Sequence, residues 1–258
     1  MNADKRRDYS LHPRTNANVF DSRRPRNLSA FICAYLRLLV LGAGAVGCGG
    51  DAKPREAPAA SVPAPATAAA ADVPAIVFLG TSLTAGLGLD PGEAYPALVQ
   101  QKLDSAGLHY RVINAGVSGE SSAGAVRRIG WVLSQAPAVL IIETGANDGL
   151  RGQSPDSLAD NLQALIDSTR RLSPHTVIVL AGMEALPNLG AEYARQFRAV
   201  FPKVARANHL ALIPFLLQGV AGVDSLNQAD GIHPNEAGAG IVAANVWLTL
   251  APLLRSRQ

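Results

Sequence analysis

A serine, an aspartate and a histidine occupy positions from which they could hydrolyse an ester. Ser82 closely follows the apolar run 75–79 (AIVFL), and Asp230 precedes His233 by three residues near the end of the chain. A serine that follows a buried strand and is flanked by glycines can be held in a tight turn with its hydroxyl exposed. An aspartate can orient a histidine, whose other ring nitrogen then takes the serine proton. These residue types predict nucleophilic catalysis, although each segment alone is also typical of a helix cap or a loop histidine.

Two segments between these residues offer hydrogen-bond donors for the oxyanion of an acyl-transfer intermediate. The segment 114–121 (NAGVSGES) contains Gly119, and the segment 143–148 (ETGAND) contains Asn147. Acyl transfer requires donors directed at the oxygen that becomes negative, and a backbone N–H beside a glycine or an asparagine amide can serve. In isolation each segment more often forms only a turn.

Five short apolar runs predict the strands that would position these residues, at 75–79, 110–113, 138–142, 176–180 and 210–215. Longer amphipathic stretches predict helices at 94–105, 121–134, 157–172, 192–208 and 236–254. Apolar strands that alternate with helices indicate a parallel sheet covered on both faces. Ligands bind beyond the carboxyl ends of such strands, and all four segments described above fall at those ends or in loops on the same side.

Taken together, the four segments resemble the SGNH (GDSL-type) hydrolase family. The order Ser82, Gly119, Asn147 and His233, with Asp230 three residues before the histidine, is typical of that family. The resemblance implies an α/β fold, namely a flavodoxin-like three-layer α/β/α sandwich with a five-stranded parallel sheet. It also implies that Ser82 is the nucleophile, that His233 is the base and that Asp230 orients the base. The oxyanion hole would consist of the N–H groups of Ser82 and Gly119 and the side-chain amide of Asn147.

One residue of the first segment departs from the family pattern. This chain has Thr81 where the family usually has the aspartate of Gly-Asp-Ser-Leu. That aspartate is not a member of the triad. The departure therefore bears on how Ser82 is positioned and on the level of activity, and not on the class of reaction.

The run 147–152 (NDGLRG) resembles, more narrowly, the bacterial branch of the family that contains thioesterase I, lysophospholipase and arylesterase activities. This resemblance implies a serine esterase that cleaves aryl esters, lysophospholipids or fatty acyl esters and thioesters through an acyl-enzyme. It implies no metal and no organic cofactor, and the five histidines show no paired spacing typical of a zinc site. The expected partner is a small ester or lipid substrate.

Cleavage of fatty acyl esters requires an apolar groove beside the nucleophile, since each buried methylene contributes about 0.8 kcal/mol. Apolar residues that follow the predicted strands are the candidates for its lining: Leu83, Leu87, Leu150, Met183, Leu186 and Pro187. The segment 183–189 is the best candidate for control of acyl-chain length, because no strand or helix pattern requires its apolar residues. The alternative is a lid that merely covers the core.

The chain divides into a leader at 1–48, an Ala/Pro-rich linker at 49–74 and a hydrolase domain at 75–258. The leader carries 8 of the 23 Lys and Arg residues and 3 of the 20 Asp and Glu residues. The basic balance therefore belongs to the leader, and the rest of the chain is mildly acidic. Without a basic stripe in the predicted domain, the sequence speaks against nucleic-acid binding. The linker composition cannot bury a core and favours an extended tether.

The leader contains a short apolar run, 38–47, directly before Cys48. Ten residues are too few for a bilayer span, which needs about 20, and the pattern is typical of a secretory signal. The segment 45–48 (AVGC) resembles the lipobox of bacterial lipoproteins, which implies lipidation of Cys48 and a membrane-anchored enzyme that faces the periplasm. Gly49 favours the outer membrane. The alternative is a plain signal peptide and a soluble periplasmic or secreted enzyme.

Two other functions are compatible with the pattern. An enzyme of the same fold could remove acetyl groups from carbohydrates, and turnover of acetyl and octanoyl esters would distinguish the two activities. A non-catalytic binding lipoprotein is the second alternative, and the presence of all five catalytic and oxyanion residues speaks against it.

Overall fold

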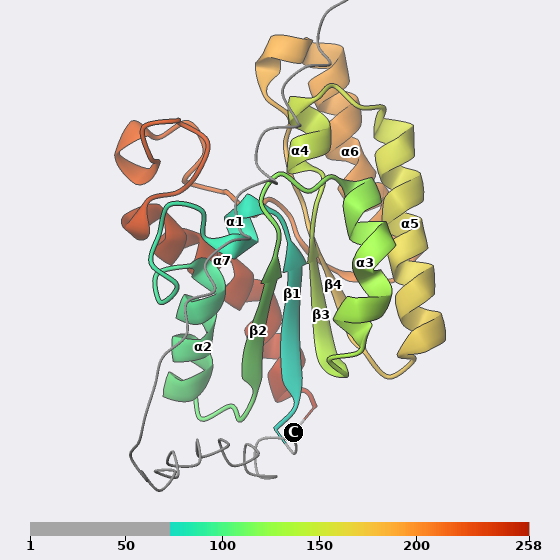
Figure 1. Ribbon diagram of the computed structural model, residues 1–258, viewed down its shortest axis with the longest axis vertical. Helices are drawn as coiled ribbons and strands as arrows, with labels where there is room; N and C mark the ends of the chain where they lie inside the picture. Colours follow the sequence, from blue (N-terminus) through green and yellow to red (C-terminus); the bar gives the residue numbers. More distant parts are fainter. Residues whose placement is uncertain (1–72, 258) are drawn as a thin grey trace, which may run out of the picture. The chain divides into compact units, whose positions relative to one another are not determined.

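Five parallel strands form a single sheet in the computed structural model, which describes residues 73–257 (Figure 1). The strands lie in the order β2-β1-β3-β4-β5, and every neighbouring pair is parallel. Their bounds are β1 (Ala75–Gly80), β2 (Arg111–Gly116), β3 (Pro137–Glu143), β4 (Val177–Ala181) and β5 (Ala211–Ile213). The predicted α/β fold with a five-stranded parallel sheet is confirmed.

The inner strands β1, β3 and β4 are apolar along most of their length because helices cover both faces of the sheet, whereas the edge strand β2 is only partly buried. All six residues of β1 are buried, as are six of the seven residues of β3. β5 is shorter than the predicted run 210–215. Pro214 follows its last residue, and a proline has no N–H with which to continue the ladder.

Two groups of helices form the outer layers. On one face α1 (Ser82–Ala85) and α2 (Tyr95–Ser105) contact β2, and α7 (Glu236–Arg255) contacts α2 and β5. On the other face α3 (Ser122–Leu133), α5 (Pro155–Leu172) and α6 (Ala191–Ala207) pack side by side. Figure 1 shows α2 and α7 on one side of the sheet and α3 and α5 on the other. The result is a three-layer α/β/α sandwich.

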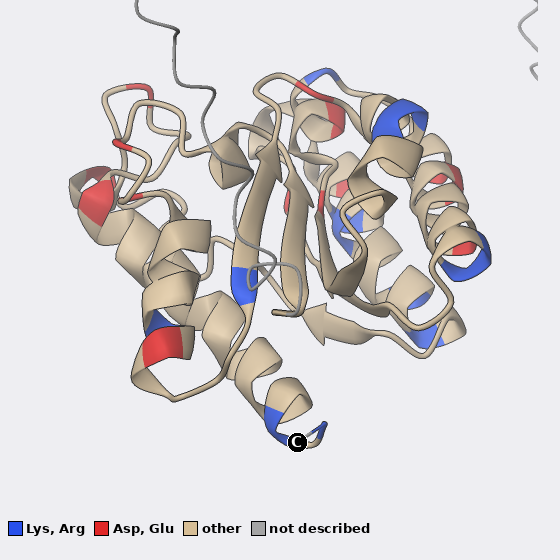
Figure 2. Cartoon of the chain, turned by 60° about the horizontal axis from the view of Figure 1, so that its bottom comes forward, with Lys and Arg blue, Asp and Glu red and all other residues tan. Residues whose placement is uncertain are grey.

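The helices bury apolar stripes at the helical period. In α5 the buried residues include Leu158, Leu162, Leu165 and Ile166, which share one face of the helix. Figure 2 shows the Lys, Arg, Asp and Glu residues mainly on the helices and loops around the sheet. Three short elements complete the described part of the chain: α4 (Ala146–Leu150), η2 (Pro187–Leu189) and η3 (Asp224–Leu226).

Within residues 73–257, α7 is the one helix that is long and apolar enough to cross a membrane. Eight of its residues are buried, and the helix packs against α2 and β5. Its apolar character therefore fits a core helix. The leader 1–48, including Cys48, and nearly all of the linker 49–74 lie outside the described residues.

Strand order decides where the site forms. β1 lies between β2 and β3, so the chain passes to opposite sides of β1 after its first and second helical connections. Ligands bind at such a switch point, beyond the carboxyl ends of the strands. The loops after β2, β1 and β3 consequently meet at one edge of the sheet.

Candidate active site

Ser82 is the first residue of α1, directly after β1. Thr81 caps the helix, and its hydroxyl accepts a hydrogen bond from the N–H of Leu83 at 3.4 Å. Gly86 ends the helix in the left-handed region (φ 74°), and a Cβ there would lie 2.5 Å from the Cβ of Ala94. Both the left-handed backbone and the close approach of Ala94 therefore require a glycine at position 86. The resulting tight turn holds Ser82 at the carboxyl edge of the sheet.

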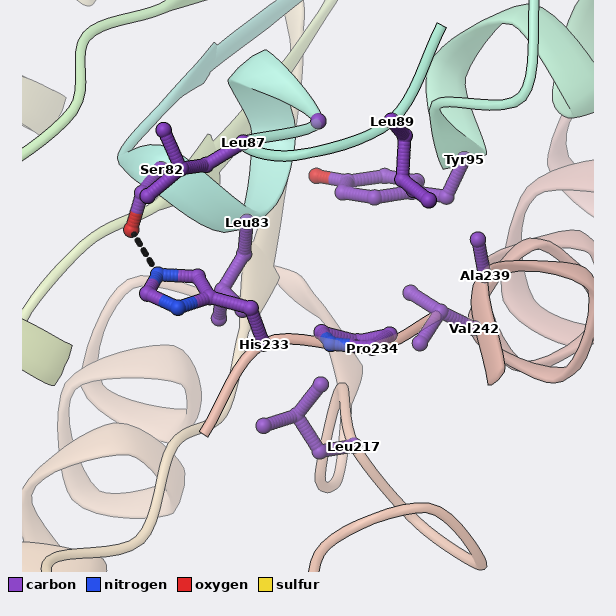
Figure 3. Close-up of a pocket in the computed structure, with 11 residues that line it drawn as sticks. Ser82, Leu83, Leu87, Leu89, Tyr95, Leu217, His233, Pro234, Ala239 and Val242 are labelled. Carbon is purple, nitrogen blue, oxygen red and sulfur yellow. Dashed lines mark hydrogen bonds between the residues drawn. The ribbon is translucent and has the colours of Figure 1, made fainter. Parts of the chain in front are cut away.

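A chain of hydrogen bonds joins Ser82 to two residues from the far end of the sequence. Nε2 of His233 lies 2.8 Å from Oγ of Ser82, and Nδ1 of His233 lies 2.6 Å from Oδ2 of Asp230. Figure 3 shows the His233 ring directed at the Ser82 hydroxyl. The predicted Ser82, His233 and Asp230 thus lie together in the geometry that proton transfer from the serine requires.

The loop that carries His233 is held by its own backbone and by the start of α7. The N–H of Gln228 donates to the carbonyl of His233 at 2.8 Å, and Asn227 and Pro234 form an antiparallel bridge. Asn235 caps α7. These contacts fix the shape of the loop, and the side-chain amide of Gln228 joins it to the turn after α1 by donating to the carbonyl of Leu87 at 2.7 Å.

Asp230 accepts two further hydrogen bonds, from the backbone N–H groups of Ile232 at 2.9 Å and His233 at 3.0 Å. The bond from the backbone of His233, its ring and the N–H of Ile232 together lower the pKa of Asp230 to about 2. The carboxylate is therefore ionised at neutral pH and can orient the imidazole and stabilise its cation.

The predicted oxyanion donors lie in the loops after the two neighbouring strands. Gly119, with φ 76°, follows β2, and Asn147 lies in α4 after β3. One amide hydrogen of Asn147 goes to the carbonyl of Glu120, with an N···O distance of 3.0 Å. An amide group has two hydrogens, so one remains for a substrate.

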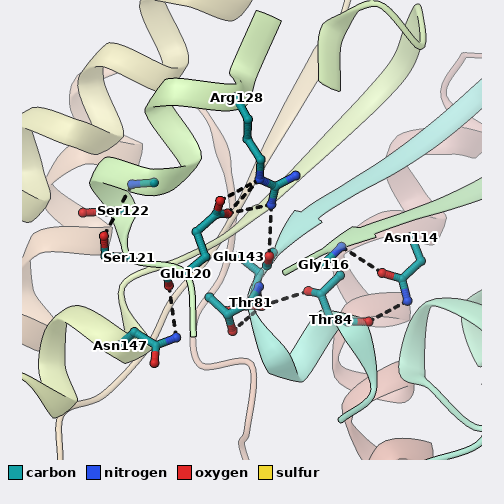
Figure 4. Close-up of polar contacts among 12 residues, drawn as sticks. Thr81, Thr84, Asn114, Gly116, Glu120, Ser121, Ser122, Arg128, Glu143 and Asn147 are labelled. Atoms are coloured by element: carbon teal, nitrogen blue, oxygen red, sulfur yellow. Dashed lines mark hydrogen bonds and ion pairs between the residues drawn. The ribbon is translucent and has the colours of Figure 1, made fainter. Parts of the chain in front are cut away.

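Polar contacts tie these loops to the nucleophile turn (Figure 4). Arg128 of α3 forms an ion pair with Glu120 at 2.6 Å and donates to the carbonyl of Gly80, the last residue of β1, at 3.2 Å. In α4, Asp148 accepts from the N–H of Ser122 at 2.8 Å. These contacts therefore fix the positions of the loops after β1, β2 and β3 relative to one another.

A buried carboxyl group lies beneath the nucleophile turn. Glu143 ends β3 and accepts from the N–H of Thr81 at 2.7 Å, from the Thr81 hydroxyl at 3.0 Å and from the Thr84 hydroxyl at 2.8 Å. The Thr84 hydroxyl also lies 2.6 Å from the hydroxyl of Tyr95. Complete burial raises the pKa of Glu143, and burial followed by the charge of Glu143 raises the pKa of Tyr95.

The role of Glu143 was missed in the sequence, where it appeared only as part of the segment that contains Asn147. One signal could have indicated it, namely a single acidic residue at the end of the run 138–142. Thr81, which replaces the usual aspartate, uses both its N–H and its hydroxyl in this network. A neutral residue at position 81 suits the site because a second carboxylate would lie against buried Glu143.

A narrow apolar pocket lies beside Ser82 and His233 (Figure 3). Its volume is about 10 Å³, close to the room that one water molecule needs. Residues from the nucleophile turn, α2, the His233 loop and α7 line it, among them Leu83 and Leu87, together with Leu217 from the segment after β5. In this conformation the pocket holds no more than a small group, and a longer chain must run outside it or widen it.

Leu83 and Leu87 line this pocket, and the other four predicted groove residues do not. Leu150 and Leu186 are each 44% exposed, and Pro187 is also exposed. Met183 is 3% exposed and packs in the hydrophobic core. Its side chain therefore does not form a surface wall in this conformation, because β4 leads it inward before the chain turns out at the loop.

The loop after β4 lies beside α4 and the turn that follows it. A Cβ at Gly149 would lie 3.5 Å from Ala185, and a Cβ at Gly152 would lie 3.7 Å from Leu189. The two segments that carry Leu150 and Leu186 are consequently neighbours, on the Asn147 side of the site. Among the described residues no cluster of His, Cys, Asp and Glu could hold a metal ion.

Comparison with known proteins gives a consistent result. The model of the GDSL-like Lipase/Acylhydrolase family matches residues 78–241. Esterase TesA of Pseudomonas aeruginosa is 42% identical over 180 residues, which cover 69% of this chain and 89% of that protein. Thioesterase 1/protease 1/lysophospholipase L1 of Escherichia coli K12 is 32% identical over 188 residues, 72% and 87% of the two chains. A crystal structure of TesA, 41% identical, superposes with a TM-score of 0.66 over 69% of this chain and 99% of that chain.

Proposed function

The chain belongs to the GDSL-like lipase/acylhydrolase family and is a carboxylic ester hydrolase, and we propose that Ser82, His233 and Asp230 are its catalytic triad. The observation that carries the proposal is the hydrogen-bonded chain, with 2.8 Å between Ser82 and His233 and 2.6 Å between His233 and Asp230. The non-catalytic alternative has no support, since the chain has the residues, the geometry and the family of an enzyme.

Acylation begins when Oγ of Ser82 attacks the carbonyl carbon of the ester. Nε2 of His233 takes the hydroxyl proton as the new bond forms. The carbonyl oxygen becomes negative and accepts hydrogen bonds from the N–H groups of Ser82 and Gly119 and from the free amide hydrogen of Asn147. When the carbonyl re-forms, the bond to the alcohol or thiol breaks, and the imidazolium of His233 donates its proton to that leaving group.

Deacylation repeats these steps with water as the nucleophile. His233 takes a proton from the water as its oxygen attacks the acyl-enzyme, and it returns that proton to Oγ of Ser82 when the acid leaves. Asp230 remains ionised throughout and stabilises the imidazolium. No oxidant, metal or further reactant is needed to balance either half of the reaction.

The triad is tested with Ser82→Ala and a fluorophosphonate probe. The variant should lose both turnover of nitrophenyl esters and covalent labelling, while its circular dichroism and melting temperature stay close to those of the unchanged protein. Ser134→Ala, at an exposed serine after α3, is the matched control and should retain both. Ester turnover in folded Ser82→Ala would overturn the assignment.

For the acyl group, we propose that Leu83 contacts its first carbons and that Leu150, Leu186 and Pro187 contact longer chains from the opposite side. Their positions around Ser82 and Asn147 support this, whereas Met183 would act only by supporting the loop. The narrow pocket also favours small acyl groups, and for that reason carbohydrate deacetylation is the second candidate. Comparison of kcat/KM for acetyl, butyryl and octanoyl nitrophenyl esters tests this: a steep decline beyond acetyl would favour deacetylation.

For localisation, we propose that the leader 1–48 directs export and that Cys48 is lipidated, with 49–74 as a tether to the membrane. The short apolar run before a cysteine supports this proposal. An enzyme tethered in this way would meet lipid or other ester substrates at a membrane surface.

A further inference from the structure

A second, shallow groove lies beside the candidate oxyanion loop. Its volume is about 530 Å³, and it is formed by the loop after β2, the start of α3 and Arg151 from the turn after α4. Gly119 lines it. The groove therefore includes a residue that is proposed to contact the reacting carbonyl oxygen, and it shares no lining residue with the apolar pocket.

The charge of this groove is positive. Three arginines and one glutamate line it, and the glutamate, Glu120, is paired with Arg128. The side chain of Arg127 is exposed, and its guanidinium has neither a hydrogen bond nor an ion pair with any residue of the described range 73–257. Arg151 is exposed as well, and within the same range its guanidinium donates only to the carbonyl of Gly119, at 2.9 Å. Among the described residues, these two guanidinium groups in one groove thus have no carboxylate partner.

We propose that Arg127 and Arg151 form a subsite for an anionic group, a phosphate or a carboxylate, on the leaving group of the ester. The proposal rests on the proposed function, because the subsite is defined by its place beside the oxyanion donors. Guanidinium groups bind phosphate and carboxylate oxygens through paired, charge-assisted hydrogen bonds. The apolar residues proposed to contact the acyl group and this cationic groove together make the site complementary to an ester that is apolar at its acyl end and negatively charged at its other end.

The test compares two substrates with the same acyl group and the same scissile bond. 1-Octanoylglycerol has a neutral leaving group, and 1-octanoylglycerol 3-phosphate has an anionic one. The quantity measured is the ratio of kcat/KM for the phosphate ester to kcat/KM for the neutral ester, with both substrates kept below the concentration at which they aggregate. Arg127→Gln should lower this ratio by about 5-fold, the size of one solvent-exposed charge interaction.

Three further variants separate charge from structure. Arg127→Lys keeps the charge and should restore most of the ratio, and Arg127→Glu should lower it beyond the glutamine variant. Arg171→Gln is the matched control, since Arg171 is exposed at the end of α5, far along the chain from the site, and should leave the ratio unchanged. Added salt should reduce the preference of the unchanged protein, because exposed charges are screened.

The proposal is overturned if the ratio is the same in Arg127→Gln and Arg171→Gln. It is also overturned if Arg127→Gln affects only esters that carry the acid on the acyl side, such as the nitrophenyl hemiester of succinic acid, since the anion would then belong to the other half of the substrate. Failure of the triad would look different: the unchanged protein would hydrolyse neither glycerol ester.

Discussion

Asp230 accepts three hydrogen bonds, from the ring and backbone N–H of His233 and from the backbone N–H of Ile232. This is more than the orientation of one imidazole needs. The backbone bonds keep the carboxylate ionised and fix its position within a three-residue turn, where Gly231 has φ 69°. A nearby opposite charge and several donors are the usual reasons for a low carboxyl pKa.

The lowered pKa makes a prediction about stability. The pKa of Asp230 falls from 3.8 to about 2 on folding, so ionised Asp230 stabilises the folded state above about pH 4 and loses this effect as the pH falls towards about 2. Solvent screening keeps the effect small, because the side chain is 45% exposed. In Asp230→Asn, the difference in free energy of unfolding from the unchanged protein should therefore shrink between pH 5 and pH 2. Denaturant unfolding at several pH values measures it, and a difference that stays constant would contradict the assignment.

The proposed role of Asn147 in the oxyanion hole predicts how its removal changes kcat. Asn147→Ala should lower kcat by about 10²–10³-fold, the usual effect of removing one oxyanion donor. KM should change much less, because the bond strengthens as charge develops on the oxygen. Steady-state kinetics with nitrophenyl butyrate provide the measurement. A change confined to KM would make Asn147 a ground-state binding residue.

At the scale of elements, the end of β3 supports the start of α1 through Glu143. Glu143→Ala would leave the N–H and the hydroxyl of Thr81 buried without an acceptor, each at a cost of about 1–3 kcal/mol, while the Thr84 hydroxyl keeps its partner Tyr95. We expect a lower melting temperature and, in protein that still folds, a kcat reduced by about 10- to 100-fold with little change in KM, because Ser82 loses its position.

Glu143→Gln is the informative companion variant. Its amide oxygen can accept from the N–H of Thr81 while its NH₂ group donates to the Thr81 hydroxyl, so most of the stability and of kcat should return. It also removes a pH dependence. Burial raises the pKa of Glu143 above its ordinary 4.5, so the folded state of the unchanged protein loses stability as the pH rises above that value, and the variant should not. If glutamine behaves like alanine in kcat, the carboxylate has a role beyond positioning.

If the loop between β4 and α6 contacts the acyl chain, a change in this loop should affect kcat/KM more for long acyl chains than for short ones. Leu186→Ala should reduce kcat/KM for octanoyl esters by about 5-fold and for acetyl esters by less than 2-fold, since only the long chain loses apolar contact. Leu172→Ala, at a leucine that is 55% exposed at the end of α5, is the control. An equal change at every length would mean that the loop supports the fold and does not read the substrate.

For the whole molecule, the proposed anchor lies in the leader and not in the apolar helix α7, which belongs to the sandwich. Mass spectrometry of the mature N-terminus should find a lipid-modified Cys48, with residues 1–47 removed. A single acyl chain anchors weakly, and stable attachment needs at least two. A free Cys48, or cleavage beyond it, would leave an exported enzyme without an anchor.

The sequence by itself determined the sheet and the family, and it predicted the reacting groups. Continuous apolar runs placed all five strands, since burial on both faces leaves a local pattern that needs no knowledge of the rest of the fold. The order of Ser82, Gly119, Asn147 and His233 indicated the family to which the chain belongs. The ends of the strands do not follow from such runs alone: β5 ends at Ile213, two residues before the end of the apolar run 210–215. A strand continues only where its backbone hydrogen bonds to the neighbouring strand continue.

Only the tertiary structure decided which side chains meet. Ser82 and His233 are separated by 151 residues, and Oγ of Ser82 lies 2.8 Å from Nε2 of His233 because the loop before α7 is joined to the turn after α1 through Gln228 and Leu87. The same edge of the sheet places Glu143 under the nucleophile turn and brings Arg127 and Arg151 into one groove. No hydrophobic periodicity in the sequence indicates these contacts, because each one joins residues from different loops. Strand order and packing decide which loops come together.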